Sequence, residues 1–146
     1  MPDMSTKLEF ESPEGRLSLS IDDVEFMAYG AGELAMRSMR ELVERMRRMG
    51  LGAIAEAHAR VQAQSKVTIM ELREMREDAE AILLLGSQGE TIDDTITPRL
   101  DALRQTIAQT QVDMRASVDR LAALAVSCHE ALMRIPGYRP PSGPRG

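Results

Sequence analysis

The sequence of 146 residues is poor in aromatic side chains, in cysteine and in long apolar runs. It has no tryptophan, two phenylalanines and two tyrosines. The single cysteine, Cys128, excludes a disulfide within one chain and is typical of a protein from a reducing compartment. No unbroken apolar run is longer than the six residues 121–126, and residues 81–85 form another short one, whereas a membrane-spanning helix needs roughly 20 apolar residues. No signal-peptide pattern opens the sequence, so we expect a cytoplasmic protein without a membrane span.

An excess of positive charge is also missing. The formal net charge is −5, with 18 Lys and Arg against 23 Asp and Glu. Nucleic-acid-binding domains usually carry a basic patch, so we expect no nucleic-acid partner. The 43% of hydrophobic residues, among them eleven methionines, are enough for a core, and the length predicts one domain.

The N-terminal segment, residues 1–21, carries the pattern of a β-hairpin. Apolar residues alternate with polar ones on both sides of a Ser-Pro-Glu-Gly turn: Leu8, Phe10, Leu17, Leu19 and Ile21. Pro at the second position and Gly at the fourth favour a tight turn. We therefore predict a hairpin that packs on the rest of the chain, because an isolated two-stranded hairpin is marginal.

Residues 22–135 change to a helical period. The apolar spacing and the terminal signals predict three helices, at about 23–49, 52–85 and 98–135, and a disordered Pro- and Gly-rich tail over 136–146. Thr97 and Pro98 resemble the cap and the first position of a helix, which leaves residues 86–97 as a loop. Gly30 and Gly32 weaken the first turns, so residues 22–32 remain open between helix and strand.

The second and third predicted helices each carry a seam that alternates spacings of three and four residues, as in coiled coils. The first seam is Leu51, Ile54, His58, Val61, Ser65, Thr68, Leu72, Met75, Ala79 and Ile82. The second is Leu100, Leu103, Ile107, Thr110, Met114, Ser117, Leu121, Leu124, Cys128 and Ala131. Counting outward from the loop pairs Ile82 with Leu100, Ser65 with Ser117 and His58 with Leu124, if the helices are antiparallel neighbours.

Both seams contain polar residues at similar heights, and we expect these to form a polar layer: His58, Ser65, Thr68, Thr110 and Ser117. A two-helix hairpin cannot bury both seams and the apolar stripe of the first predicted helix. That helix therefore folds back along the hairpin or binds another chain. The sequence predicts an all-α protein, an antiparallel three-helix bundle with long coiled-coil-like helices and a short N-terminal β-hairpin.

A methionine-rich stripe on the first predicted helix is a candidate partner interface. Its residues are Met36, Met39, Val43, Met46 and Met49. Methionine adapts to irregular surfaces and is common where a partner helix binds. The same spacing is typical of core packing, and paired thioethers can also bind a soft metal such as Cu(I). We take the interface as the hypothesis and expect no metal and no cofactor.

Residues for acid–base or nucleophilic catalysis do not converge in this sequence. No carboxylate stands three or four residues from His58 along its seam. Cys128 and His129 are adjacent and point about 100° apart on a helix, although a contact between Cys128 and His58 is an open alternative. Neither histidine has Glu three residues before it, which excludes the di-iron bundle motif. We expect a protein that is not an enzyme.

Basic residues cluster in the second half of the first predicted helix: Arg37, Arg40, Arg45, Arg47 and Arg48. Such a cluster can bind phosphate. However, Glu33, Glu41 and Glu44 stand at helical spacing from these arginines, which favours a solvated face with ion pairs.

These patterns together predict a non-enzymatic helical protein–protein interaction module. It would be a small oligomerising subunit, an adaptor or a chaperone of a larger assembly, and its partner would be a protein or a second copy. One alternative is a secreted or particle-structural helical hairpin protein. Another is a small ligand or metal sensor that uses the polar layer of the bundle.

Overall fold

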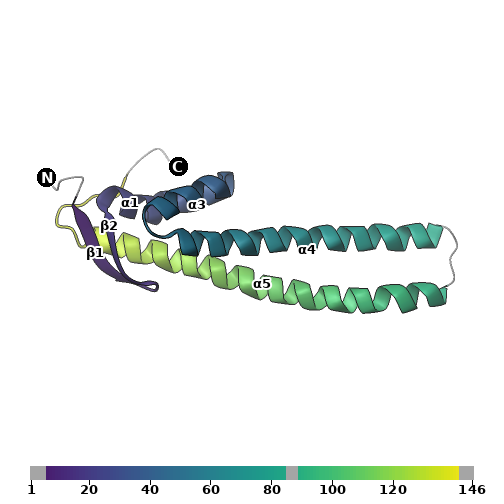
Figure 1. Ribbon diagram of the computed structural model, residues 1–146. Helices are drawn as coiled ribbons and strands as arrows, with labels where there is room; N and C mark the ends of the chain where they lie inside the picture. Colours follow the sequence, from purple (N-terminus) through teal and green to yellow (C-terminus); the bar gives the residue numbers. More distant parts are fainter. Residues whose placement is uncertain (1–5, 85–88, 142–146) are drawn as a thin grey trace. The chain divides into compact units, whose positions relative to one another are not determined.

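The computed structural model describes residues 6–84 and 89–141 (Figure 1). The protein is mostly helical, with a two-stranded antiparallel hairpin near the N-terminus. It divides into two compact units. The mixed unit contains the residues up to Glu56 and those from Val118 onward, and the two-helix unit contains Ala57–Ser117.

The predicted β-hairpin is confirmed as β1 (Lys7–Ser12) and β2 (Gly15–Ser20). Its register pairs Leu8 with Leu19 and Phe10 with Leu17, so that apolar side chains share one face. Ser12 closes the turn, because its Oγ accepts from Glu14 N–H at 3.1 Å. Gly15 ends the turn at φ +102°, a conformation that favours glycine.

Six helical segments follow the hairpin within the described residues. They are α1 (Ile21–Glu25), the π-helix η1 (Phe26–Gly30), α2 (Ala31–Arg37), α3 (Met39–Arg48), α4 (Gly52–Leu84) and α5 (Gly89–Met133). Ser20 caps α1, since its Oγ accepts from Asp23 N–H at 3.1 Å. The segment left open between helix and strand, residues 22–32, is therefore helical.

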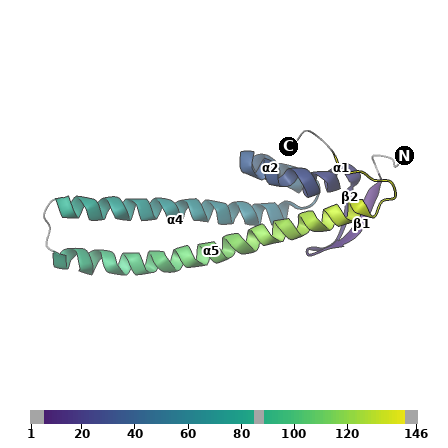
Figure 2. The same cartoon turned by 180° about the vertical axis from the view of Figure 1, so that it is seen from behind.

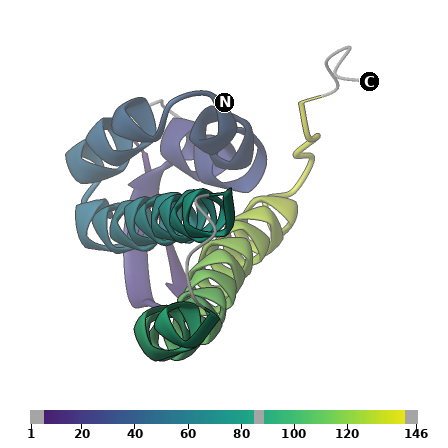
Figure 3. The ribbon, with the colours of Figure 1, turned by 90° about the vertical axis from the view of Figure 1, so that its right-hand side faces the viewer.

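The predicted continuous helix over 23–49 is wrong. Ser38 adopts an extended conformation, with φ −157° and ψ 102°, and separates α2 from α3. The two helices lie side by side (Figure 3). Ser38 Oγ accepts from Glu41 N–H at 3.3 Å, so Ser38 and Glu41 occupy the cap and third position of a new helix. The Ser-x-x-Glu sequence is the signal that the periodicity masked.

The start of the third predicted helix is also corrected. The helix α5 begins at Gly89 instead of residue 98, and Pro98 lies inside it. The predicted loop over 86–97 is thus helical from residue 89, and residues 86–88 lie outside the described residues. Ile96 stands four residues before Leu100, so the apolar spacing in the sequence continues upstream of the proline. The prediction that a helix begins at Pro98 is therefore wrong. The first position of a helix is a preferred place for proline, but here the proline lies within the helix.

Order also extends beyond the predicted end of the last helix. Ile135 and Tyr138 pack against the core of the mixed unit, and Tyr138 Oη donates to Glu25 Oε2 at 2.6 Å. Burial and this hydrogen bond raise the pKa of Tyr138. The final part of the predicted tail, residues 142–146, lies outside the described residues.

The mixed unit has one apolar core, to which the hairpin, the short helices, the start of α4 and the end of α5 contribute. Its largest fully buried side chains are Val24, Leu42, Met46, Leu124, Cys128 and Leu132. At the edge of this core, Arg120 of α5 donates two hydrogen bonds to the Glu14 carboxylate in the β-turn. This pair lowers the pKa of Glu14 and ties the turn to α5.

The two-helix unit contains parts of α4 and α5, which run antiparallel side by side (Figures 1 and 2). Its buried apolar side chains include Met75 and Leu103. The predicted three-helix bundle is not confirmed, because the residues of the first predicted helix belong to the mixed unit.

Replacing Ser38 with Ala tests the helix break. We expect the free energy of unfolding to fall by about 1 kcal/mol, because Glu41 N–H loses its acceptor. Ser38→Asp keeps an acceptor and is expected to retain stability. A continuous helix would reverse the sign, since alanine is the better helix former by about 0.5 kcal/mol. Urea unfolding followed by circular dichroism distinguishes the two results.

Candidate protein-interaction site

A buried histidine anchors the polar layer of the two-helix unit. His58 is 4% exposed, and its Nδ1 lies 2.6 Å from Ser117 Oγ. Its Nε2 lies 3.2 Å from the amide nitrogen of Gln62. Because an amide nitrogen only donates, Nε2 accepts and Nδ1 carries the proton that is donated to Ser117. Both ring nitrogens therefore have partners.

The pairing of the two seams differs from the predicted one by one heptad. The prediction placed Ser65 opposite Ser117, whereas Ser117 contacts His58. Ser65 instead shares a groove with Thr110. The prediction counted from a loop that ended at residue 97, but α5 already begins at Gly89. A shift of seven residues leaves both seams facing each other, so the periodicity alone does not separate the two registers.

The groove lies along one side of this pairing and has a volume of about 210 Å³. Its walls are Ser65, Thr68, Ile69 and Leu72 of α4 and Ile107, Thr110 and Gln111 of α5. Ile69 is 56% exposed, and Leu72, a seam residue, is 42% exposed. Thr68 Oγ1 donates to the Gln64 carbonyl at 2.9 Å and so makes its hydrogen bond within its own helix. The seam is therefore open to solvent on this side.

The methionine-rich stripe does not form one exposed face. Met46 is fully buried in the core of the mixed unit, and Met39, Val43 and Met49 are half-buried against it. Met36 lies on α2, before the break at Ser38, and is 90% exposed. The interface hypothesis for these residues is thus not supported by their burial, because four of the five contribute to core packing.

Cys128 lies in the core of the mixed unit and has no exposed surface. Burial raises its thiol pKa to about 12, so the thiolate needed for nucleophilic attack is scarce near neutral pH. The neighbouring His129 points elsewhere: its Nδ1 lies 2.8 Å from Tyr29 Oη, and the two rings meet edge to face. The histidine and the thiol therefore have separate surroundings.

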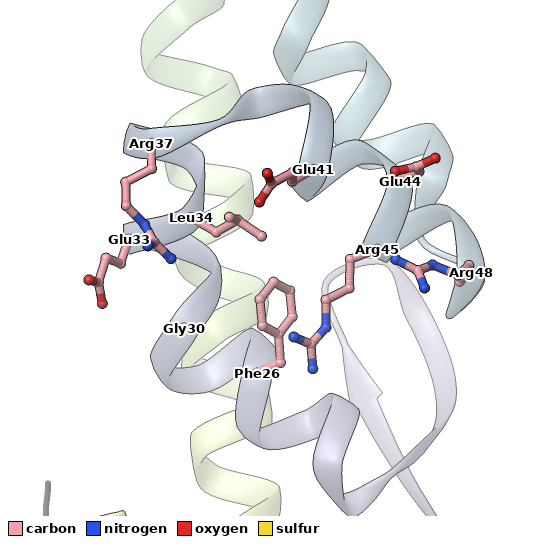
Figure 4. A pocket seen from close by; sticks show the side chains of 9 residues that line it. All are labelled: Phe26, Gly30, Glu33, Leu34, Arg37, Glu41, Glu44, Arg45 and Arg48. Carbon is pink, nitrogen blue, oxygen red and sulfur yellow. The ribbon is translucent and has the colours of Figure 1, made fainter.

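Arg45 and Arg48 of α3 line a cavity of about 510 Å³ between η1, α2 and α3 (Figure 4). The Arg45 guanidinium stacks over the Phe26 ring at 3.8 Å and donates to Asp22 Oδ2 at 3.4 Å. The other charged residues around the cavity are Glu33, Arg37, Glu41, Glu44 and Arg48. Since three arginines face three glutamates, the cavity is balanced in charge and is a poor site for an anion.

Two of the predicted arginine–glutamate pairs along one helix are replaced by tertiary pairs. Arg45 forms an ion pair with Asp22 of α1, and Arg47 forms one with Glu56 near the start of α4. These pairs join elements of the mixed unit. They favour the interpretation of the cluster as a solvated surface with ion pairs over that of a phosphate site.

Within the part of the chain that the structure describes, no three side chains among His, Cys, Asp and Glu are grouped so that they could hold a metal ion. Likewise, no helix among these residues combines the length and the apolar character that crossing a bilayer requires.

The pKa of His58 predicts a pH dependence of stability. Burial lowers this pKa below its ordinary value of 6.5, so the unfolded chain binds a proton at a pH where the folded chain does not. The free energy of unfolding is therefore expected to fall as the pH drops from about 7 to about 5. His58→Gln removes this titration and is expected to flatten the dependence, whereas His129→Gln keeps it. Identical pH profiles for His58→Gln and the natural chain would contradict the assignment.

The burial of Cys128 predicts a slow reaction with iodoacetamide. We expect alkylation of the folded chain to be at least about a hundredfold slower than that of an exposed thiol, because the thiolate is scarce and shielded. The control is the exposed position 122, as Ala122→Cys in a Cys128→Ala background. Mass spectrometry follows both reactions, and equal rates would show that Cys128 is accessible.

Comparison with protein-family models, with curated proteins and with solved structures gives no match. No relative therefore supplies a family, a ligand or a catalytic residue.

Proposed function

We propose that the chain is a non-enzymatic helical protein–protein interaction module, which acts as a small subunit, adaptor or chaperone of a larger assembly. The two-helix unit is the part that makes the contact. Its partner presents a helix or a helical surface to the groove between α4 and α5.

The open seam is the observation that carries this proposal. A pair of helices has only one shared interface, and Leu72 remains 42% exposed although it occupies a seam position. Ile69 extends the apolar wall of the same groove, where Ile107 faces it from α5. Each square ångström of apolar surface that another helix covers stabilises the association by about 25 cal/mol. A third or fourth helix would complete the packing as in larger bundles.

The surroundings of the reactive side chains also support a role without catalysis. Cys128 is buried with a raised pKa, and both nitrogens of His58 are occupied by neighbouring side chains. General acid–base catalysis needs a titratable group within reach of a substrate. Neither residue offers a free reactive atom next to the groove.

A small ligand in the polar layer is the competing function, and the groove favours it less. Pockets for small molecules usually enclose about 300–1,000 Å³ and bury most of the ligand. The groove measures about 210 Å³ and is open along its length. A row of side chains from a partner helix fits this shape better than a small molecule does.

A photo-crosslinking residue at position 69 tests the proposal. We expect benzoylphenylalanine at Ile69 to give a discrete protein adduct in cells that produce the chain, because this side chain lines the groove. The matched control is Gln105, which is exposed on α5 but is not a groove residue. Gel mobility and mass spectrometry identify the adduct.

The proposal is overturned if neither position 69 nor position 67 on the other side of the helix pair gives a discrete protein adduct. An adduct of equal yield at the control position 105 would also overturn it, because the reaction would then be unspecific.

A further inference from the structure

The two-helix unit has two broad faces, one on each side of its seam. On both helices, the residues directly after each seam position form the front face, and those directly before it form the back face, about 100° away on either side. The same rule holds for α4 and α5 because the two helices are antiparallel. Ile69 and Gln111 belong to the front face and line the groove. Asp78 and Arg99 belong to the back face, where they form an ion pair of 3.6 Å between the two helices.

The front face carries an excess of positive charge. Its exposed basic residues follow helical spacing along both helices: Lys66, Arg73, Arg76, Arg104 and Arg115. The acidic residues on this face are Glu80 and Asp101, and they are engaged by Arg76 at 3.3 Å and by Arg104 at 3.7 Å. Lys66, Arg73 and Arg115 thus surround the groove with positive charge, in a chain whose net charge is −5.

The back face carries the opposite charge. Its acidic residues are Glu71, Glu74 and Asp78 of α4 and Asp113 of α5, against Arg60 and Arg99. In its middle stands an exposed apolar side chain, Val67, which is 47% exposed and lies four residues before Glu71. An apolar residue with acidic neighbours is the complement of an apolar groove with basic neighbours.

These charges select one mode of self-association. Two front faces repel each other, and so do two back faces, so a symmetric contact of like with like is disfavoured. A front face and a back face attract each other. We infer that the groove receives the back face of a second copy, with Val67 of one copy over Ile69 and Leu72 of the next. This inference rests on the proposed function and names its partner.

Such a contact uses two different surfaces of each copy and is heterologous. It leaves one front face and one back face free at the ends of every dimer, so that growth continues until a ring closes or a filament forms. The contact depends on charge, and we expect added salt to weaken it.

Charge reversal on each face tests the inference with the full chain. The front variant carries Lys66→Glu and Arg73→Glu, and the back variant carries Glu71→Lys and Glu74→Lys. Each variant alone brings like charges together, and we expect self-association to weaken at least about tenfold. An equimolar mixture restores opposite charges at every contact and is expected to regain the assemblies of the natural chain. Sedimentation velocity over a range of concentrations measures all four samples.

A matched control separates the face from the total charge. Glu77→Lys changes the charge of α4 between the two faces and is expected to leave the assemblies unchanged. Regained assembly in the mixture also shows that both variants are folded, since unfolded chains would not recover.

The outcomes separate this inference from the proposed function. A natural chain that stays monomeric at every concentration overturns the inference, and so does a mixture that fails to regain assembly. If position 69 still crosslinks a different protein in either case, the proposed function stands. If the chain is monomeric and neither position 69 nor position 67 gives a discrete protein adduct, both are overturned.

Discussion

The contact between His58 and Ser117 fixes the register of α4 against α5 in the two-helix unit, and the surfaces of that unit depend on it. A heptad seam repeats every seven residues, so apolar packing alone allows several registers that differ little in free energy. The buried imidazole of His58 distinguishes them, because its Nδ1 loses the hydrogen bond to Ser117 in another register, whereas Gln62 of the same helix stays beside Nε2. The register in turn brings Ser65, Thr68 and Thr110 to one groove and places Asp78 next to Arg99.

The two units are stabilised in different ways. The mixed unit gathers side chains from the hairpin, the short helices and both long helices into one core, in which Leu42, Met46 and Leu124 have no appreciable exposed surface. The two-helix unit has only the seam between its helices. Three of its most buried side chains, His58, Thr68 and Thr110, are polar. Polar groups in a seam reduce stability but restrict the choice of partner and register, which suits a surface that associates specifically.

The same geometry accounts for the division of roles that we propose. The mixed unit holds the groups that resemble reactive residues in sequence, Cys128 and the arginines of α3, but uses them in packing and ion pairs. The two-helix unit exposes apolar side chains beside unbalanced charge. Apolar contact supplies affinity, whereas the charges select the orientation in which a partner approaches.

The sequence by itself determined the β-hairpin and the two long helices, because strand alternation, heptad spacing and turn residues are local signals. Only the tertiary structure decided three other features. The break at Ser38 required a capping hydrogen bond to compete with a helical periodicity that runs through it. The register of the seams depended on where α5 starts, and a seven-residue repeat does not encode that point. The burial of Met46 and the exposure of Met36 depended on the fold of the mixed unit, since equal spacing gives core and surface stripes alike.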